Sequence, residues 1–349
     1  MTRPRVDRRH VLAAAAASGA LLVLPAATRA QALERKSLTI AVGGKNLLYY
    51  LPLTIAEQLK YFEAEGLDVK IVDFAGGARA LQAVVGGSAE VVSGAFEHTL
   101  NMQAKGQPMR AFVLQGRAPQ IVLAVSTKTM AGYKSMADLK GKKIGVTAPG
   151  SSTHIMTNFV LAKAGLKPTD VSIVGVGASQ GAVAAMRAGQ IDAISNLDPV
   201  ITILQRSGDI RIVSDTREVA EADKVFGGPM PAACLYAPQP FLDRNPNVAQ
   251  ALTNAIVRAN KWIQQAGPSD IIKVVPEGFL LGDRAIYIDA FLKAKGALSP
   301  DGLFPEAGSA TALRALASVD EAMQKAKLDL NANYTNDFAR KANARYPKG

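Results

Sequence analysis

Hydrophobic and polar positions along this chain switch repeatedly between the period of a strand and the period of a helix. Strand alternation is found over residues 37–42, 68–74 and 91–93, and helical spacing over 53–65, 78–85 and 96–105. Glycine follows each strand, at Gly43, Gly76 and Gly94, where the backbone has to turn. Because strands and helices take turns, the pattern predicts a mostly parallel sheet with helices on both faces.

This pattern is used twice along the chain. Further strands are predicted at 144–146, 171–176 and 193–195, with helices between them that end at Ala164 and Ala188. The run from Gly87 to Ser93 has its counterpart in the run from Gly189 to Ser195, 102 residues further on. A repeat of this length is a lobe rather than a solenoid unit. We therefore expect two similar α/β lobes with a cleft between them.

After Pro238 the spacing is helical only, and these helices are expected to pack around the first lobe. They are predicted at 248–265, 283–295, 309–325 and 336–344. The apolar segments 121–125 and 232–236 flank the second repeat and are expected to connect the lobes as a hinge. The predicted division is 33–122 with 237–349 for the first lobe and 123–236 for the second.

Composition narrows the chemistry that the chain can carry. Of 349 residues, 48% are apolar and 20% charged, which is typical of a packed globular protein. Cys234 is the one cysteine in the sequence, which excludes an intramolecular disulfide and a cysteine-based zinc or iron–sulfur site. With three histidines in the whole sequence, we expect no metal and no other cofactor.

The first 32 residues have the pattern of an export segment. Arginines at 3, 5, 8 and 9 precede an apolar run over 11–24, and Ala30-Gln31-Ala32 forms a small-x-small cleavage site. The apolar run is shorter than the ~20 residues that span a bilayer. Arg8-Arg9 resembles a twin-arginine signal, with Sec export as the alternative. We expect a signal peptide cleaved after Ala32 and a mature protein in a bacterial periplasm.

The formal net charge of +11 falls on cleavage, because residues 1–32 carry five arginines and Asp7, but the mature chain stays basic. Basic residues do not form a run interleaved with aromatic residues, so nucleic acid is not expected as a partner. A mildly positive field favours an anionic small molecule.

Several motifs together resemble one family. They are PLTIAEQLKYFEAEGLDV at 52–69, DLKGKKIGV at 138–146, GSSTH at 150–154 and YTNDF at 334–338. In these motifs the sequence resembles the periplasmic solute-binding proteins of the nitrate/sulfonate/taurine type, which also include binders of thiamine-pyrimidine precursors and serve ATP-binding-cassette importers. The resemblance implies a two-lobe, type II-like periplasmic binding fold. It also implies hinge closure on a solute and delivery to a permease with its ATPase.

Strand-to-helix loops are where a ligand is expected, because ligands of doubly wound sheets lie beyond the carboxyl ends of the strands. The glycine-rich loops are 43–46, 76–79, 149–153 and 175–179. Close backbone approach, unpaired N–H groups and the helix dipole favour an anion there. From these loops we expect ligand contacts by Lys45, Asn46, Gly76, Gly77, Arg79, Ser151, Ser152, Thr153 and Ser179. Further expected contacts come from Tyr49, Phe96, Arg117, His154 and Asp198.

Each of these residues also has a structural alternative. In this alternative, Ser151 or Ser152 only caps a helix, and Asp198, which precedes Pro199, caps another. The arginines are solvated, and the aromatic side chains pack in the core. For His98 a structural role is expected, and Glu97 is the other acid at a strand end.

The sequence thus predicts a monomeric binding protein for a small organic anion, with a sulfonate or a carboxylate as the leading class. A ligand-binding partner of a membrane sensor would have the same fold and site. An enzyme related to thiamine-pyrimidine synthesis is not expected, since those relatives carry a cysteine-rich cluster and this chain has only Cys234.

Overall fold

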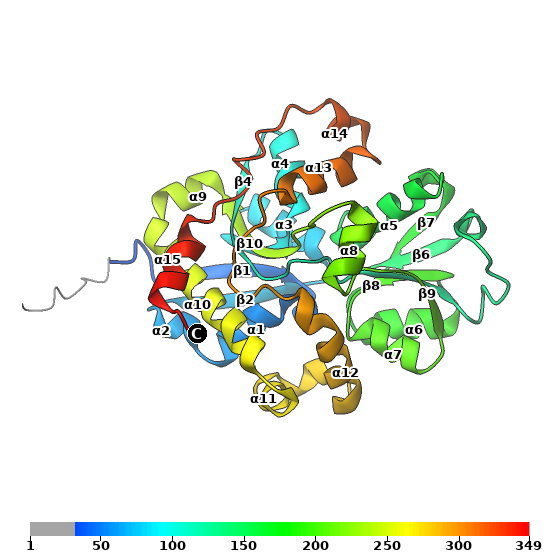
Figure 1. Ribbon diagram of the computed structural model, residues 1–349, viewed down its shortest axis with the longest axis horizontal. Helices are drawn as coiled ribbons and strands as arrows, with labels where there is room; N and C mark the ends of the chain where they lie inside the picture. Colours follow the sequence, from blue (N-terminus) through cyan, green and yellow to red (C-terminus); the bar gives the residue numbers. More distant parts are fainter. Residues whose placement is uncertain (1–31, 349) are drawn as a thin grey trace, which may run out of the picture. The chain divides into compact units, whose positions relative to one another are not determined.

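Two five-stranded sheets organise the chain in the computed structural model, which describes residues 32–348 (Figure 1). The export segment predicted over residues 1–32 lies outside the described residues, apart from Ala32. From Leu33 onward the chain forms one compact unit. Among the described helices, none combines the length and the apolar character that crossing a membrane requires.

The first sheet has the strand order β2-β1-β3-β10-β4. Its strands are β1 (Ser37–Gly43), β2 (Asp68–Phe74), β3 (Val91–Ala95), β4 (Met109–Leu114) and β10 (Ala233–Pro238). β1 runs parallel to β2 and β3, with Ile40 opposite Ile71 on one side and Val91 on the other. The helices between these strands are α1 (Leu51–Gln58), α2 (Tyr61–Ala64), α3 (Gly77–Val85) and α4 (Glu97–Ala104). The single helix predicted over 53–65 is divided, because Lys60 takes a left-handed φ of 58° between α1 and α2.

The second sheet repeats this order as β7-β6-β8-β5-β9. Its strands are β5 (Val122–Ser126), β6 (Lys143–Val146), β7 (Ser172–Gly175), β8 (Ala193–Asn196) and β9 (Ile210–Asp215). Its helices are α5 (Ser152–Lys163), α6 (Gln180–Ala188) and α7 (Val200–Arg206). β6 is parallel to β7 and β8, as the repeat predicts.

Each sheet contains one strand that is antiparallel to the others. These two strands occupy most of the segments 121–125 and 232–236, which were expected to connect the lobes. β10 is antiparallel to β3 and β4, and β5 is antiparallel to β8 and β9. The segments 121–125 and 232–236 therefore lie largely inside the sheets, and the crossings are 115–121 and 216–232. Val122 belongs to the second sheet and residues 233–236 belong to the first. Strands buried on both faces are uniformly apolar, which is why they resembled connectors.

The C-terminal helices contact both lobes. They are α9 (Gln239–Arg244), α10 (Pro246–Gln265), α11 (Pro268–Val274), α12 (Arg284–Ala294), α13 (Gly308–Ala317), α14 (Glu321–Lys325) and α15 (Asp337–Arg345). α10 and α15 cover the first sheet, as predicted. α12 differs, because Asp289 pairs with Arg206 of α7 at 3.0 Å and Ile286 packs on the second lobe's apolar cluster. α13 contacts α4 of the first lobe and α5 of the second.

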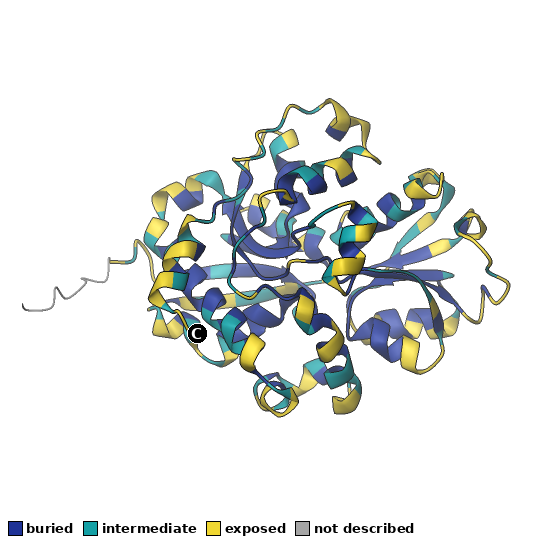
Figure 2. Cartoon of the chain, viewed as in Figure 1, coloured by how far each residue is buried: buried dark blue, intermediate teal, exposed yellow. Residues whose placement is uncertain are grey.

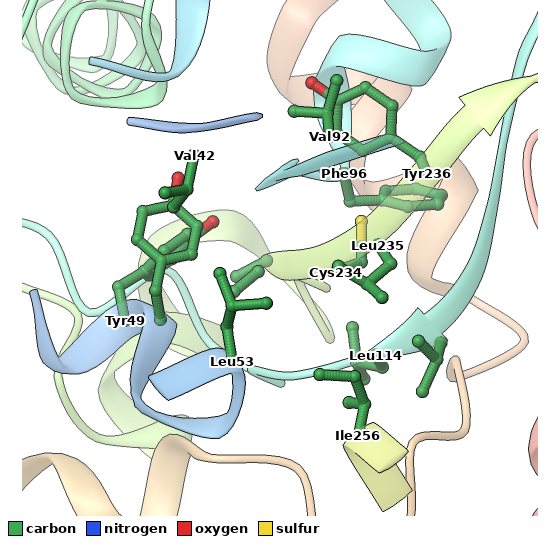
Figure 3. Close-up of a cluster of buried hydrophobic side chains, with 14 of the residues drawn as sticks. Val42, Tyr49, Leu53, Val92, Phe96, Leu114, Cys234, Leu235, Tyr236 and Ile256 are labelled. Carbon is green, nitrogen blue, oxygen red and sulfur yellow. The ribbon is translucent and has the colours of Figure 1, made fainter. Parts of the chain in front are cut away.

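The central strands of both sheets are buried between helices, whereas β2, β7 and most of β9 are half-buried or exposed (Figure 2). Figure 3 shows part of the first lobe's core, where Tyr49, Phe96 and Cys234 lie among aliphatic side chains. Burial raises the pKa of the Cys234 thiol well above its usual range. A thiol held in its protonated form is a poor nucleophile, so Cys234 is a core residue.

Arg217 lies at the start of the crossing 216–232 and forms ion pairs with two carboxylates. Its Nη1 lies 3.4 Å from Oδ2 of Asp198, and its Nη2 lies 2.6 Å from Oδ2 of Asp215. The side chains of Arg217 and Asp198 are only 6% and 2% exposed. The Thr202 N–H and hydroxyl also donate to Asp198 Oδ1, at 2.8 and 2.7 Å. Asp198 therefore ties the start of α7 to the crossing.

Replacing Arg217 by methionine should destabilise the protein strongly, because Asp198 is left buried without its cation. We expect the free energy of unfolding to fall by about 3–5 kcal/mol, as measured by chemical denaturation of residues 33–349. The double variant Asp198→Asn with Arg217→Met removes both charges and should recover most of this loss. A double variant as unstable as Arg217→Met would show that packing, not charge, sets the cost.

Candidate ligand-binding site

A small cavity lies between the lobes, beyond the carboxyl ends of β1, β3 and β6. It is lined by Gly43, Leu47, Tyr49, Tyr50, Gly77, Ala95 and His98 of the first lobe, by Ile121 of the crossing, and by Thr147, Ser151, Ser152, Thr153 and Leu197 of the second lobe. The space that the centre of a water molecule can reach inside it is ≈ 20 Å³, which is room for about one water. The lobes are therefore closed on each other.

Direct hydrogen bonds between the lobes surround this cavity. The Ala78 N–H donates to Ser151 Oγ at 3.0 Å, and the Ser152 hydroxyl donates to Glu97 Oε1 at 2.5 Å. Further along the interface, the Asn46 amide donates to the Ala178 carbonyl at 2.9 Å. The Leu48 N–H donates to the Asp198 carbonyl at 3.1 Å. The first turns of α3, α4 and α5 thus meet around the cavity.

Gly76 explains how closely the lobes approach. A Cβ atom at this position would lie 2.8 Å from the Ala148 Cβ and 2.9 Å from Ser151 Oγ, both on the other lobe. Real Cβ atoms do not approach neighbours so closely. Gly76 therefore contributes by having no side chain, which lets the start of α3 reach the start of α5.

The cavity is rich in hydrogen-bond donors that carry no formal charge. Gly77 opens α3 and Ser152 opens α5, and the first N–H groups of a helix have no partner inside the helix. Their dipoles favour negative charge. The Tyr49 hydroxyl is buried, and no hydrogen-bond partner for it is found among the described residues.

His98 places a second unpaired group beside the cavity. Its Nδ1 lies 3.0 Å from the Tyr236 hydroxyl, while its Nε2 is buried and has no hydrogen-bond partner within residues 32–348. Because a buried O–H group has to donate, the Tyr236 hydroxyl donates to Nδ1, and the ring proton lies on Nε2. Burial lowers the pKa of His98 to about 4. The ring is therefore a neutral donor at pH 7.

Glu97 is the acid nearest to these donors. It is 1% exposed, and its carboxyl group accepts the Ser152 hydroxyl. Burial raises its pKa above the ordinary 4.5, and the bond from Ser152 only partly opposes this. No lysine or arginine is found among the described residues that line the cavity. An anion in the cavity would be bound by neutral groups, and the Ser152 hydroxyl would lie between it and the Glu97 carboxyl group.

The structure brings several of the predicted ligand residues together. Tyr49, Gly77, Ser151, Ser152 and Thr153 line the cavity. Gly76 lies directly behind them, against Ser151. The Thr153 hydroxyl accepts the Thr147 N–H at 3.1 Å, which fixes the turn into α5. Apart from Tyr49, these residues come from the glycine-rich loops 76–79 and 149–153.

Other predicted residues lie away from the cavity. Lys45 pairs with Glu57 at 2.6 Å, and the ring of Phe96 packs on Phe304 with centroids 5.5 Å apart. His154 accepts the Gly150 N–H through Nδ1 at 3.0 Å. Asn46 and Asp198 hold the interface and the crossing, as described above.

The two predicted arginines point into solvent. Arg79 is exposed and contacts Gln82 on its own helix, with Nη1 3.2 Å from Oε1. Arg117 is exposed on the crossing, and its Nε donates to the Gly296 carbonyl at 3.0 Å. Neither lines the cavity.

Ser179 lies in Gly177-Ala178-Ser179-Gln180-Gly181, which has the G-x-S-x-G spacing of a serine nucleophile. The structure does not give it that role. Its backbone is extended, with φ −144° and ψ −155°, rather than in a sharp, strained turn. The side chain is exposed, and it bonds to no histidine or acid among the described residues.

Eight of the residues that line the cavity lie outside the predicted set, and three of these carry polar side-chain groups. Tyr50 follows Tyr49 in a short helical turn, Thr147 is the first residue after β6, and His98 stands in the first turn of α4. The place of Thr147 directly after the predicted strand 144–146 was a signal in the sequence that it lies at the ligand-binding edge of the sheet. For His98 the sequence carries no such signal, because its exposure to the cavity depends on the partner that Tyr236 provides from β10.

Glu97 gives a prediction on pH and stability. Its pKa is raised in the folded protein, so the folded state binds more protons than the unfolded state between 4.5 and the raised value. Stability therefore falls as the pH rises through this window and stays lower above it. Glu97→Gln mimics the neutral side chain. We expect its melting temperature to exceed that of the wild type at pH 7 and to match it below about pH 4.

Thermal melts of both proteins across this pH range would measure the effect. If Glu97→Gln melts below the wild type at pH 7, the ionised carboxylate stabilises the start of α4 or the bond to Ser152, and the argument from burial fails.

Comparison with solved structures supports the two-lobe architecture. A protein from Bordetella bronchiseptica is 63% identical, with a TM-score of 0.90 over 91% of this chain and 100% of that one. The alkanesulfonate-binding protein SsuA from Xanthomonas axonopodis pv. citri, bound to MOPS, is 20% identical, with a TM-score of 0.63 over 89% and 99%. The periplasmic nitrate-binding protein NrtA from Synechocystis is 16% identical, with a TM-score of 0.68 over 90% of each chain.

The expected periplasmic binding fold is confirmed, because the two mixed sheets and flanking helices of this chain match the folds of these neighbours. At the level of sequence, the model of one family matches residues 31–275, which cover both sheets and the cavity between them. The chain belongs to the NMT1-like family.

Proposed function

We propose that this protein is the periplasmic substrate-binding component of an ATP-binding-cassette importer. The observation that carries the proposal is a cavity whose donors come from both lobes, with Tyr49 and His98 on one side and the start of α5 on the other. A solute that bonds to both lobes binds the closed form better than the open form and shifts the equilibrium toward closure.

The proposed solute is a small organic anion with a sulfonate or a carboxylate group. The N–H groups at the starts of α3 and α5, with the hydroxyl of Ser151, suit the oxygens of such a group. In the closed form the cavity has room for about one water, so the lobes have to lie further apart when they hold the solute. The lining contains no lysine or arginine among the described residues, and Glu97 is close, so a single negative charge fits better than two. The names of the structural neighbours, an alkanesulfonate binder and a nitrate binder, support an anion.

In this proposal the protein acts as a monomer and breaks no bond. Closure is the signal that a permease with its ATPase reads before it accepts the solute. The buried thiol of Cys234 and the exposed Ser179 have no catalytic partners in the described structure, which supports binding over catalysis. A membrane sensor would use the same closure. Neighbouring genes for a permease and an ATPase, rather than for a histidine kinase, would distinguish the two.

A thermal-shift screen of residues 33–349 tests the solute class. The panel would contain alkanesulfonates, taurine, nitrate, bicarbonate, aromatic carboxylates and pyrimidine precursors. A ligand at 100 times its dissociation constant adds about 2.7 kcal/mol to the free energy of unfolding, which raises the melting temperature by a few degrees. A flat response to every anion would exclude the proposed class.

Replacing Ser151 and Ser152 together by alanine should weaken binding of the best solute by about 1–3 kcal/mol, because the Ser151 hydroxyl donor is lost and the nearby Glu97 carboxyl loses its hydrogen bond from Ser152. Isothermal titration calorimetry measures the change. Ser179→Ala, at the exposed start of α6, is the matched control and should bind as the wild type does. Unchanged affinity of the double variant with a lower melting temperature would mean that the two serines only join the lobes.

A further inference from the structure

The end of the second lobe that points away from the first lobe collects the starts of its strands. The loop 127–142 between β5 and β6 lies at this end, at the far right of Figure 1. Backbone bonds join it to the neighbouring strand starts, since the Thr127 N–H donates to the Asp209 carbonyl at 3.0 Å and the Gly141 N–H to the Asp170 carbonyl at 2.7 Å. We call this surface the distal pole. It comprises residues 127–143, 167–172, 187–192 and 208–211.

Positive charge is concentrated on the distal pole. Its lysines are exposed, apart from one that is half-buried, Lys142, and they are Lys128, Lys134, Lys140, Lys142, Lys143 and Lys167. With Arg187 and Arg211 they outnumber the aspartates of the pole by eight to four. Two of the aspartates bond to backbone, since Asp138 accepts the Lys134 N–H at 2.7 Å and Asp192 accepts the Lys143 N–H at 3.0 Å. The pole therefore presents a net positive surface to solvent.

Most of these lysines form no bond within the fold. Four of them have no hydrogen bond or ion pair from Nζ among the described residues, and these are Lys134, Lys142, Lys143 and Lys167. The pKa of Asp138 is lowered mainly by the Lys134 and Ser135 N–H groups, and the charges of Lys134 and Lys142 add to this at longer range. No lysine of the pole stands in the last turn of an α-helix, where the helix dipole favours a cation. Neither packing nor helix dipoles account for them.

The first lobe shows that the topology does not require such a charge. Its sheet has the equivalent strand order, and the starts of β1, β2 and β3 form the corresponding end. There Arg35 and Lys36 are accompanied by Glu34, Asp68 and Glu90. Arg35 pairs with Glu90 at 2.9 Å. The excess of cations is therefore a property of the second lobe's surface and not of the fold.

The cations of the distal pole cover a broad area. Lys167 precedes β7 at one edge of the sheet, and Arg211 lies in β9 at the other edge. Five strands at their usual spacing span about 20 Å. Tyr133 and Met136 are half-buried on the same surface, and the Arg211 guanidinium lies 5.1 Å from the centroid of the Tyr133 ring. Cations spread over this width, with an amphipathic aromatic ring among them, suit an extended anionic plane better than a small ion.

We propose that the distal pole binds the anionic headgroup surface of a phospholipid membrane. The contact is electrostatic and reversible, since each lysine close to such a surface strengthens binding by roughly fivefold. The cavity lies at the opposite edge of the same sheet, beyond the carboxyl end of β6, so contact through the pole leaves the lobes free to open and close. The inference goes beyond the proposed function and does not depend on which solute the protein binds.

Binding to lipid vesicles tests the proposal. Residues 33–349 would be mixed with vesicles of phosphatidylcholine alone, or of phosphatidylcholine and phosphatidylglycerol in equal parts, and the bound fraction would be measured by co-sedimentation. We expect binding to the anionic vesicles at low salt and its loss as the salt concentration rises, because salt screens exposed charges. Equal binding to both kinds of vesicle would exclude an electrostatic contact and overturn the proposal.

The lysines without partners provide the variant. Joint replacement by glutamine should weaken binding to anionic vesicles more than tenfold, and it should leave the melting temperature close to that of the wild type, because no bond within the fold is lost. The four positions are Lys134, Lys142, Lys143 and Lys167. If this variant melts at a lower temperature, the double variant Lys134→Gln with Lys167→Gln takes its place. Both of these positions are in loops, and we expect a several-fold loss of binding.

A matched control removes the same charge elsewhere. The first lobe and its C-terminal helices carry four exposed lysines that also form no ion pair among the described residues, and these are Lys36, Lys70, Lys273 and Lys341. Their joint replacement by glutamine should weaken vesicle binding far less than the variant of the pole does. Equal losses would mean that total charge carries the binding and would overturn the proposal. Absence of wild-type binding to anionic vesicles at low salt would also overturn it, and would leave an acidic protein surface as the partner of the pole.

Discussion

The direct meeting of the first turns of α3 and α5 is the contact on which the site depends. It requires that Gly76 have no side chain, since a Cβ would lie 2.8 Å from the Ala148 Cβ. It is held by Ser151, whose oxygen accepts the Ala78 N–H. Because two helix starts face each other across this contact, their unpaired N–H groups and positive dipole ends converge on one small volume. The lobes would otherwise present two separate, weaker donor surfaces.

The cavity has no cation among its described lining residues, and the Glu97 carboxyl group bonds to one of them, Ser152. Neutral donors hold an anion well only where water is excluded. In this closed form Glu97 is buried, and burial raises the pKa of its carboxyl group. Under the proposed function, closure would strengthen these neutral donors, and the nearby carboxyl group would limit the negative charge of the solute.

The sequence was sufficient for the architecture and only partly for the site. Strand alternation, helical spacing and the glycines after strands are local signals, so they located β1, β2, β6 and the loop before α5 well. β5 and β10 were missed as strands because a run that is buried on both faces has no alternation. The roles of Asp198 and His98 depend on Arg217 and Tyr236, which are distant in sequence. Their pairing is a property of the folded chain that no local pattern encodes.

α12 adds an attachment between the lobes that is independent of the two crossings. It packs on the first lobe's core through Tyr287 and Phe291, and it reaches the second lobe through Ile286 and Asp289. The two crossings, 115–121 and 216–232, by themselves would permit the lobes both to bend and to twist relative to each other. An attachment placed away from them resists the twist and leaves bending about one axis as the easy motion. Each opening and closing would then return the same surfaces to the same register, so the geometry of the site is reproduced in every cycle.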